Sequence, residues 1–403
     1  MRSELKLDLL ITAFAILLGV FSYFVKNLEP GDNIISPVSK TASIFSFFGR
    51  NEKPKKIIYG YLPWWSLEKI EYLQLDKLTD IAYFGLHINS DGSFQEYLDD
   101  GTPEPGYQRW QENKDLKKLI KQTKKHGVRF SLTIISHYDD TSDEFLGCQS
   151  CWITLAQNIK SEMKRNGAEH VNLNFEYAGE TDIEQARQYS EFAKFLNGWL
   201  DAEYGDSYLV TSAFADSVYK PRVSSDLNNL GKAVDGIFIM AYDFHRPTSD
   251  YAGPVAPINQ PGFDIKEMLG DYLANVPPEK IILGVPYYGY NWVVEDATPR
   301  SKRIEGAEEI GFSQSQTYAG VMETILEVNP YVNWDEEARV PYFTYVSPET
   351  GSIRQAYYEN ERSLTEKYDL VLENDLAGVG IWALGYDDGY KELWGALYDS
   401  FVR

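Results

Sequence analysis

Short runs of β-branched and aromatic residues alternate with helical stretches from residue 56 to the C-terminus. This alternation predicts a parallel α/β architecture, because each parallel strand needs a crossover, usually helical, to reach the next one. Helices are predicted, for instance, at 115–126, where Gly127 forms the cap, and at 183–203. Strands are predicted at residues 57–62, 81–87, 129–135, 170–175, 208–213, 236–241, 280–286 and 378–383.

Eight such strands predict an α/β fold of the (β/α)8 TIM-barrel type over residues 55–403. An open doubly wound sheet is the alternative, but no Gly-x-Gly-x-x-Gly nucleotide loop follows the first strand. A small α+β insertion is predicted at 293–358, between strand 7 and helix 7, with short strands at 331–334, 341–346 and 353–358. Such an insertion would wall one side of a cleft at the C-terminal rim.

The N-terminus carries a membrane signal, because residues 9–25 form a mostly apolar run between Lys6 and Lys26. At about 1.5 Å per residue, this run just crosses a hydrocarbon core of about 30 Å. No small-x-small exit follows it, which favours an uncleaved transmembrane anchor at 1–26 over a removed signal peptide. Residues 27–54 are predicted to be a linker. The remaining chain is then expected outside the cytoplasm, at the cell surface, or secreted if the segment is cleaved.

Charge and cysteine content exclude several classes of function. A formal net charge of −22 argues against a nucleic-acid partner, which needs a basic surface. The chain has two cysteines, Cys148 and Cys151, too few for a zinc site of four ligands. We rank a structural disulfide before a redox pair. Oligomeric state stays open.

One predicted strand has an unusual polar face. In an extended strand, Asn172, Asn174 and Glu176 point to one side while three apolar residues point to the other. Polar groups buried in this way are costly unless they are hydrogen-bonded, so they form either a network that fixes a core or a site. Active sites of barrel enzymes lie at the C-terminal ends of the strands, where Glu176 is expected.

Aromatic residues and acids gather at the predicted C-terminal strand ends. A carboxylic acid surrounded by tyrosines and tryptophans suits carbohydrate chemistry, in which rings stack on sugars and an acid protonates a leaving oxygen. Each aromatic alone is more often core than platform, so their convergence is the informative part. The residues concerned are Tyr61, Trp64, Tyr242, Asp243, Tyr288 and Trp382.

Residues from about 56 to 403 resemble glycoside hydrolase family 18, the chitinase-like barrels. The resemblance rests on blocks in the family's order. They are Glu169-x-x-Asn172-x-Asn174-x-Glu176 for the family's Asp-x-x-Asp-x-Asp-x-Glu, Met240-Ala241-Tyr242-Asp243, the stretch from Gly284 to Gly289, and the stretch from Gly378 to Trp382. A further stretch, Ser363-Leu364-x-x-Lys367, is similar to spore-cortex-lytic members.

This resemblance implies roles for the site residues. Glu176 is expected to be the general acid, with the substrate's own acetamido carbonyl as nucleophile and net retention. Asn174 is expected to accept the acetamide N–H, and Tyr242 to bond the acetamido oxygen. Substrate contacts are expected from Tyr61, Trp64, Asn172, Asp243, Tyr288 and Trp382. No metal or organic cofactor is expected.

The departures from the family pattern leave alternatives open. Asn172 and Asn174 stand where the family has acids, and a neutral residue at 174 lends less electrostatic stabilisation. The predicted function is a membrane-anchored glycosidase, chitinase-like or endo-β-N-acetylglucosaminidase-like, that cleaves β-linked N-acetylglucosamine polysaccharide (peptidoglycan or chitin). The alternative is a catalytically impaired chitinase-like carbohydrate-binding protein. A redox protein built on Cys148 and Cys151 ranks third.

Overall fold

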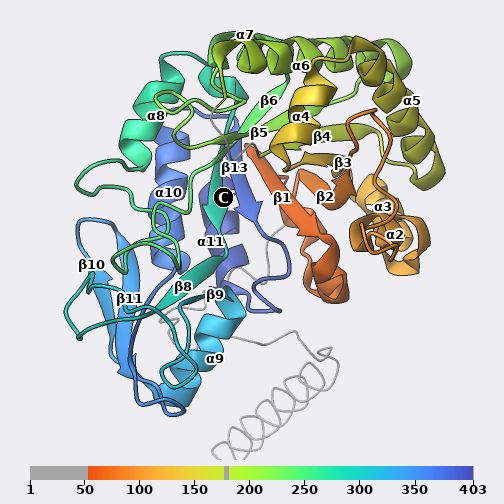
Figure 1. Ribbon diagram of the computed structural model, residues 1–403. Helices are drawn as coiled ribbons and strands as arrows, with labels where there is room; N and C mark the ends of the chain where they lie inside the picture. The colour runs from red at the N-terminus through yellow and green to blue at the C-terminus, as the bar shows by residue number, and fades with distance from the viewer. Residues whose placement is uncertain (1–52, 177–180, 403) are drawn as a thin grey trace, which may run out of the picture.

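A closed barrel of eight parallel strands forms the body of the molecule in a computed structural model that describes residues 53–176 and 181–402 (Figure 1). The strands follow one another around the barrel in the order β1-β13-β7-β6-β5-β4-β3-β2, and every neighbouring pair is parallel. Their bounds are β1 (Ile57–Pro63), β2 (Asp80–His87), β3 (Arg129–Ser136), β4 (His170–Phe175), β5 (Leu209–Phe214), β6 (Gly236–Met240), β7 (Ile281–Pro286) and β13 (Gly378–Trp382).

The predicted TIM barrel is therefore confirmed. The helix predicted at 115–126 is α3, which ends at Gly127 in the left-handed conformation with φ 66°. Asn113 begins it by accepting a hydrogen bond from the backbone N–H of Leu116 at 2.8 Å. The helices of the barrel are η2 (Trp64–Tyr72), η3 (Leu75–Lys77), α2 (Pro105–Glu112), α3 (Lys114–His126), α4 (Asp139–Leu146), α5 (Gln149–Asn166), α6 (Ile183–Tyr204), α7 (Leu227–Ala233), α8 (Ile265–Leu273), η4 (Pro278–Lys280), α10 (Glu361–Glu373) and α11 (Glu392–Phe401).

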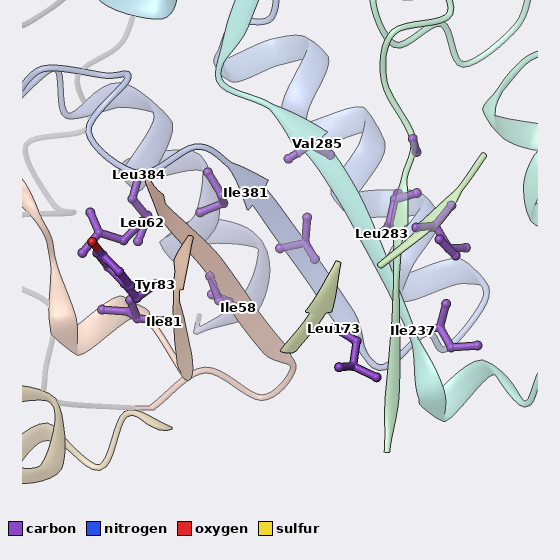
Figure 2. Packing of buried hydrophobic residues seen from close by; sticks show 14 of the residues in the cluster. Ile58, Leu62, Ile81, Tyr83, Leu173, Ile237, Leu283, Val285, Ile381 and Leu384 are labelled. Carbon is purple, nitrogen blue, oxygen red and sulfur yellow. The ribbon is translucent and has the colours of Figure 1, made fainter. Parts of the chain in front are cut away.

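Alternation along the strands separates two apolar layers. Outward-facing residues such as Ile58, Ile81 and Leu283 pack under the surrounding helices (Figure 2). Inward-facing residues form a separate cluster inside the barrel, made of Tyr59, Tyr61, Ala82, Phe84, Ile135, Val210, Phe238 and Ile282. The barrel interior is thus a packed core and not an open channel.

The Phe238 ring lies inside the barrel and packs directly against the backbone of two glycines. A Cβ atom at Gly284 would lie 2.6 Å from its ring, and one at Gly380 would lie 2.0 Å from it. These two glycines are direct neighbours across β7 and β13. Both family blocks therefore carry glycine where the aromatic ring leaves no room for a side chain.

The insertion predicted at 293–358 is a five-stranded antiparallel sheet in the order β10-β11-β12-β8-β9, placed beside the barrel with α9 (Figure 1). It begins earlier than predicted, because β8 already starts at Tyr288. The three predicted strands are present, whereas β8, β9 and α9 were not predicted. The bounds are β8 (Tyr288–Val293), β9 (Gln314–Thr317), α9 (Tyr318–Val328), β10 (Val332–Asp335), β11 (Val340–Val346) and β12 (Ile353–Tyr357).

Two predictions concern other parts of the chain. The anchor at 1–26 and nearly all of the linker at 27–54 lie outside the described residues. Among residues 53–176 and 181–402, no helix combines the length and the apolar character needed to cross a membrane. The disulfide between Cys148 and Cys151 is present, with a Cα–Cα distance of 5.2 Å, at the start of α5.

A buried ion pair joins the end of the insertion to the barrel wall. Lys367 on α10 donates from Nζ to Oε2 of Glu359, just after β12, at 2.8 Å. The side chains are 0% and 1% exposed. Burial raises the pKa of Glu359, and Lys367 opposes that rise. Removing one partner of such a pair leaves the other charge buried and uncompensated.

We predict that Lys367→Met lowers the free energy of unfolding by about 3–5 kcal/mol, as expected for breaking a buried pair. The double variant Lys367→Met/Glu359→Gln should lose less, because it removes both charges. Lys302→Met is the control, since its pair with Glu295 is exposed and should contribute under about 1 kcal/mol. Urea denaturation measures all three, and a Lys367→Met value no larger than the control's contradicts the prediction.

Candidate active site

A cavity of about 590 Å³ opens at the C-terminal ends of the barrel strands. Its walls come from β4, β5, β6 and β13, from the loops that follow them, and from the insertion. The residues that line it include Tyr61, Asn174, Glu176, Ser212, Asp216, Lys220, Arg222, Tyr242, Asp243, Arg246, Tyr288, Tyr290, Arg300, Trp382 and Tyr386.

The end of β4 brings Asn174 and Glu176 together. Asn174 is 2% exposed, and its Nδ2 donates to Oε1 of Glu176 at 2.9 Å. The Glu176 backbone N–H donates to Ser136 O at 3.0 Å, which extends the β3–β4 ladder past the last residue of β4. The Glu176 side chain is 33% exposed, so its carboxyl group reaches the cavity while its backbone stays on the barrel.

His137 directly follows β3 and lies against both of these residues. Its Nε2 is 3.0 Å from Asn174 Nδ2 and 3.6 Å from Glu176 Oε1. Burial lowers the pKa of His137, although Glu176 pulls the other way. The ring of His87, at the end of β2, lies 5.6 Å away. Burial lowers the pKa of His87 to about 4, and His137 adds to the effect.

Tyr242 and Trp382 lie on neighbouring parts of the mouth. Burial raises the pKa of Tyr242, and Tyr61 and Glu176 raise it further. Its hydroxyl group therefore stays protonated and can donate a hydrogen bond. The Trp382 ring packs on Tyr61, with centroids 5.5 Å apart, and Tyr61 shares a hydrogen bond of 2.7 Å with Ser212. These contacts fix the aromatic base of the cavity.

Asp243 is held by tyrosines from the insertion. It lies in the left-handed region with φ 63°, which aspartate tolerates better than most residues. Its Oδ1 accepts hydrogen bonds from the hydroxyl groups of Tyr288 and of Tyr290, the latter at 2.5 Å. Arg246 lies 3.6 Å from its Oδ2. The insertion therefore builds one wall of the cavity.

Asp216 is the third carboxylate of the cavity and is held by two cations. Arg222 donates to both of its oxygens at 3.0 Å, and Lys220 lies 2.9 Å away. Burial raises the pKa of Asp216, but these two partners outweigh burial, so the pKa lies below its usual value. One carboxylate shared by two cations leaves this wall with an excess positive charge.

Seven of the nine predicted site residues line the cavity: Glu176, Asn174, Tyr242, Tyr61, Asp243, Tyr288 and Trp382. Asn172 and Trp64 are not among the lining residues. Asn172 is fully buried, and its Nδ2 donates to Val210 O at 3.2 Å. Trp64 packs partly against the core and lies edge-on to Trp65. Direct substrate contact by these two residues stays a prediction.

Sequence reasoning missed His137, Trp65 and Tyr386 as site residues. Trp65 is 45% exposed, lies 6.4 Å from the Trp382 ring, and donates from Nε1 to the Tyr386 hydroxyl at 3.2 Å. The two adjacent tryptophans, Trp64 and Trp65, were a signal in the sequence, but they do not show which ring is half-buried and which is exposed. The position of His137 after the third strand was the signal for that residue.

Comparison with known proteins identifies the family. Residues 57–387 match the family described as glycosyl hydrolases family 18. The chain belongs to this family. It is a glycoside hydrolase.

Proteins similar to this family-18 chain are named as a glycosylase, a lytic enzyme and a chitinase. It is 27% identical over 318 residues to a putative sporulation-specific glycosylase YdhD of Bacillus subtilis (strain 168), covering 77% of this chain and 67% of that protein. It is 24% identical over 328 residues to a cortical fragment-lytic enzyme of Bacillus anthracis, covering 81% and 68%. A solved Ostrinia furnacalis group IV chitinase in complex with allosamidin shares the fold, with a TM-score of 0.73 at 19% identity, covering 86% of this chain and 98% of that one.

The low pKa of His87 predicts how stability of this family-18 barrel depends on pH. The folded pKa of about 4 lies below the ordinary 6.5, so the unfolded chain takes up a proton first as pH falls. The contribution of a neutral His87 is complete above pH 6.5 and is lost between pH 6.5 and 4. His87→Gln should therefore lose less stability than the wild type over that interval. Denaturant unfolding at several pH values measures this, with the exposed His126→Gln as control, and an unchanged slope for His87→Gln contradicts it.

Proposed function

We propose that the protein hydrolyses β-linked N-acetylglucosamine-containing polysaccharide, peptidoglycan or chitin, by a substrate-assisted retaining mechanism. The observation that carries the proposal is the pair of Asn174 and Glu176, bonded to each other at 2.9 Å in a cavity that Tyr242 and Trp382 also line. An acid, an amide acceptor and a protonated phenol are the groups that such a reaction needs around one N-acetylated sugar.

In the first step, Glu176 gives its proton to the glycosidic oxygen as the bond to the anomeric carbon breaks. The carbonyl oxygen of the substrate's 2-acetamido group attacks that carbon and closes an oxazolinium ring. Because Oε1 of Glu176 accepts from Asn174, Oε2 is the oxygen that carries the proton to the leaving group. Tyr242 donates to the acetamido oxygen and holds it below the anomeric carbon.

In the second step, Glu176 is ionised and acts as the base. It takes a proton from a water molecule, whose oxygen attacks the anomeric carbon and opens the oxazolinium ring. The acetamido group is regenerated, and Glu176 recovers its proton. Two inversions at one carbon give net retention.

The state of the other two carboxylates in the cavity supports the substrate as nucleophile. Asp216 is bound by Arg222 and Lys220, and Asp243 accepts from two tyrosine hydroxyl groups. A carboxylate whose oxygens already accept strong hydrogen bonds is a poor nucleophile. A mechanism that uses the substrate's own acetamide needs no second free carboxylate.

Relatives support the substrate class, since one is called a cortical fragment-lytic enzyme and a chitinase with this fold was solved with allosamidin. We also propose that the apolar run at 9–25 anchors the enzyme in a membrane, with the barrel outside the cytoplasm. A second candidate function is a catalytically impaired carbohydrate-binding protein, and the neutral Asn174 favours it.

One experiment separates the two functions. Incubated with labelled N-acetylglucosamine oligomers and with peptidoglycan, the wild type should release products whose new reducing ends are initially β, as NMR can follow. Glu176→Gln should lose at least about a thousandfold in kcat while still binding the oligomers, because the acid is lost and the cavity is kept. Asn174→Asp should retain or gain activity. Binding without turnover in all three proteins supports the carbohydrate-binding function instead.

The charge on the Asp216 wall favours an acidic glycan. Four cations line the cavity (Lys220, Arg222, Arg246 and Arg300) against three carboxylates, whereas acids outnumber bases by 60 to 38 in the whole chain. Lys220 is the exposed member of the Asp216 cluster, with 62% of its side chain accessible. A cation at the mouth of a cleft attracts a substrate that carries carboxylates, as peptidoglycan does.

We predict that Lys220→Met lowers kcat/KM for carboxylate-bearing peptidoglycan fragments roughly threefold, the size expected for an exposed charge contact. Activity on neutral N-acetylglucosamine oligomers should stay unchanged. The difference should shrink in high salt, because exposed charges are screened. Lys121→Met, exposed on α3 away from the cavity, is the control, and an equal loss on both substrates contradicts the prediction.

A further inference from the structure

The amide of Asn174 has both of its N–H groups directed at acceptors. Nδ2 lies 2.9 Å from Oε1 of Glu176 and 3.0 Å from Nε2 of His137. Its carbonyl oxygen, Oδ1, has no hydrogen-bond partner within the described residues, although Asn174 lines the cavity. The N–H groups of the amide are therefore used within the protein, while the carbonyl oxygen Oδ1 is available to a ligand in the cavity.

This arrangement determines the state of His137. Oε1 of Glu176 is an acceptor, so the amide turns Nδ2 toward it. In this orientation Nε2 of His137 also accepts from Nδ2, which leaves Nε2 bare and puts the proton of the neutral ring on Nδ1. Turning the amide by 180° would place Oδ1 against Oε1 of Glu176 and against Nε2, which sets lone pairs against lone pairs. With Nε2 bare, His137 and Glu176 together therefore favour the orientation in which Nδ2 faces both of them.

We infer that His137 is a positioning residue, which holds the Asn174 amide with its carbonyl oxygen turned into the cavity to receive the acetamido N–H of the substrate. This role rests on the proposed function, and it deepens it. In the first step the acetamido N–H becomes more acidic as the ring closes, so an acceptor fixed in place strengthens its bond as the reaction proceeds. His137 is not among the residues that line the cavity, and it acts through Asn174.

Protonation of His137 would undo this arrangement. An Nε2–H group cannot accept from Asn174, so the amide turns to offer Oδ1 to the imidazolium and presents its N–H groups to the substrate. The titratable groups packed around His137 are Glu176 from β4 and His87 from β2, with Asp139 and Asp140 following at the start of α4. Burial lowers the pKa of His137, so this loss comes at a pH below the ordinary imidazole range. With Asn174 unable to titrate, His137 sets the acid limb of activity.

Two substitutions separate positioning from a structural role. His137→Gln offers an amide oxygen at a similar reach but cannot be protonated, whereas His137→Leu offers no acceptor. We expect His137→Gln to keep wild-type kcat/KM near neutral pH within about threefold and to lose the acid limb. We expect His137→Leu to lose about five- to tenfold near neutral pH, the size of one lost hydrogen bond, and to approach the wild type below the acid limb, where the protonated ring has lost its acceptor as well. His126→Gln serves as the control, and His87→Gln shows whether the neighbouring histidine sets the limb instead.

Activity profiles on N-acetylglucosamine oligomers and NMR of histidine labelled with ¹⁵N in the ring test the inference together. The nitrogen shifts of His137 should be those of a neutral ring with bare Nε2. The inference is overturned if Nε2 carries the proton at neutral pH, if His137→Gln keeps the wild-type acid limb, or if His137→Leu is as active as the wild type near neutral pH. Absence of hydrolysis by the wild type would contradict the proposed function. The NMR experiment would still test whether Nε2 of His137 accepts a hydrogen bond from Asn174.

Discussion

The site depends on one hydrogen bond, from Asn174 to Glu176, between side chains two residues apart. In a strand, such neighbours share a face, so β4 needs no loop to bring them together. The bond from the Glu176 backbone N–H to Ser136 O keeps the residue on the barrel just past the end of the strand. The acid is therefore fixed by the same ladder that closes the barrel, while its carboxyl group reaches the cavity. Sites built on strands hold their geometry better than sites built on mobile loops.

The surroundings of Asn172, which does not line the cavity, explain why β4 carries a carboxamide at this position. Asn172 is fully buried, and its Oδ1 has no hydrogen-bond partner among the described residues. An ionised carboxylate in that place would be buried and would face the Val210 carbonyl oxygen that now accepts from Nδ2, which is far more costly than a neutral amide. The sequence has Asn172 and Asn174 where the family pattern that it resembles has acids. In the proposed mechanism, Glu176 is then the residue of this strand that supplies charge.

Most of the barrel could be predicted because its strands follow a simple pattern of apolar and polar residues. The insertion could be predicted only in part. Its first strand, Tyr288–Val293, continues directly from β7 with aromatic residues that suited a family block equally well. Trp64 and Trp65 are adjacent, and the turn of η2 decides which ring is exposed. The sequence places His137 at the end of the third strand, but its contact with Asn174 could not be predicted, because that contact depends on the register that sets Ile135 opposite Asn174.

A neutral residue at 174 changes the charge balance of the intermediate. In the proposed mechanism, Glu176 gives up its proton as the oxazolinium ring forms, so one negative and one positive charge appear together and balance without a further acid. A second carboxylate would add an attraction of about 4 kcal/mol at 4 Å in a partly screened site, but it would leave the pair with an excess negative charge. Asn174 instead contributes a neutral hydrogen bond of about 1 kcal/mol, and that bond forms only if its amide faces the substrate. In the proposed mechanism, the orientation of the Asn174 amide therefore replaces the negative charge that the family pattern has at position 174. His137 matters in this chain because we infer that it fixes that orientation.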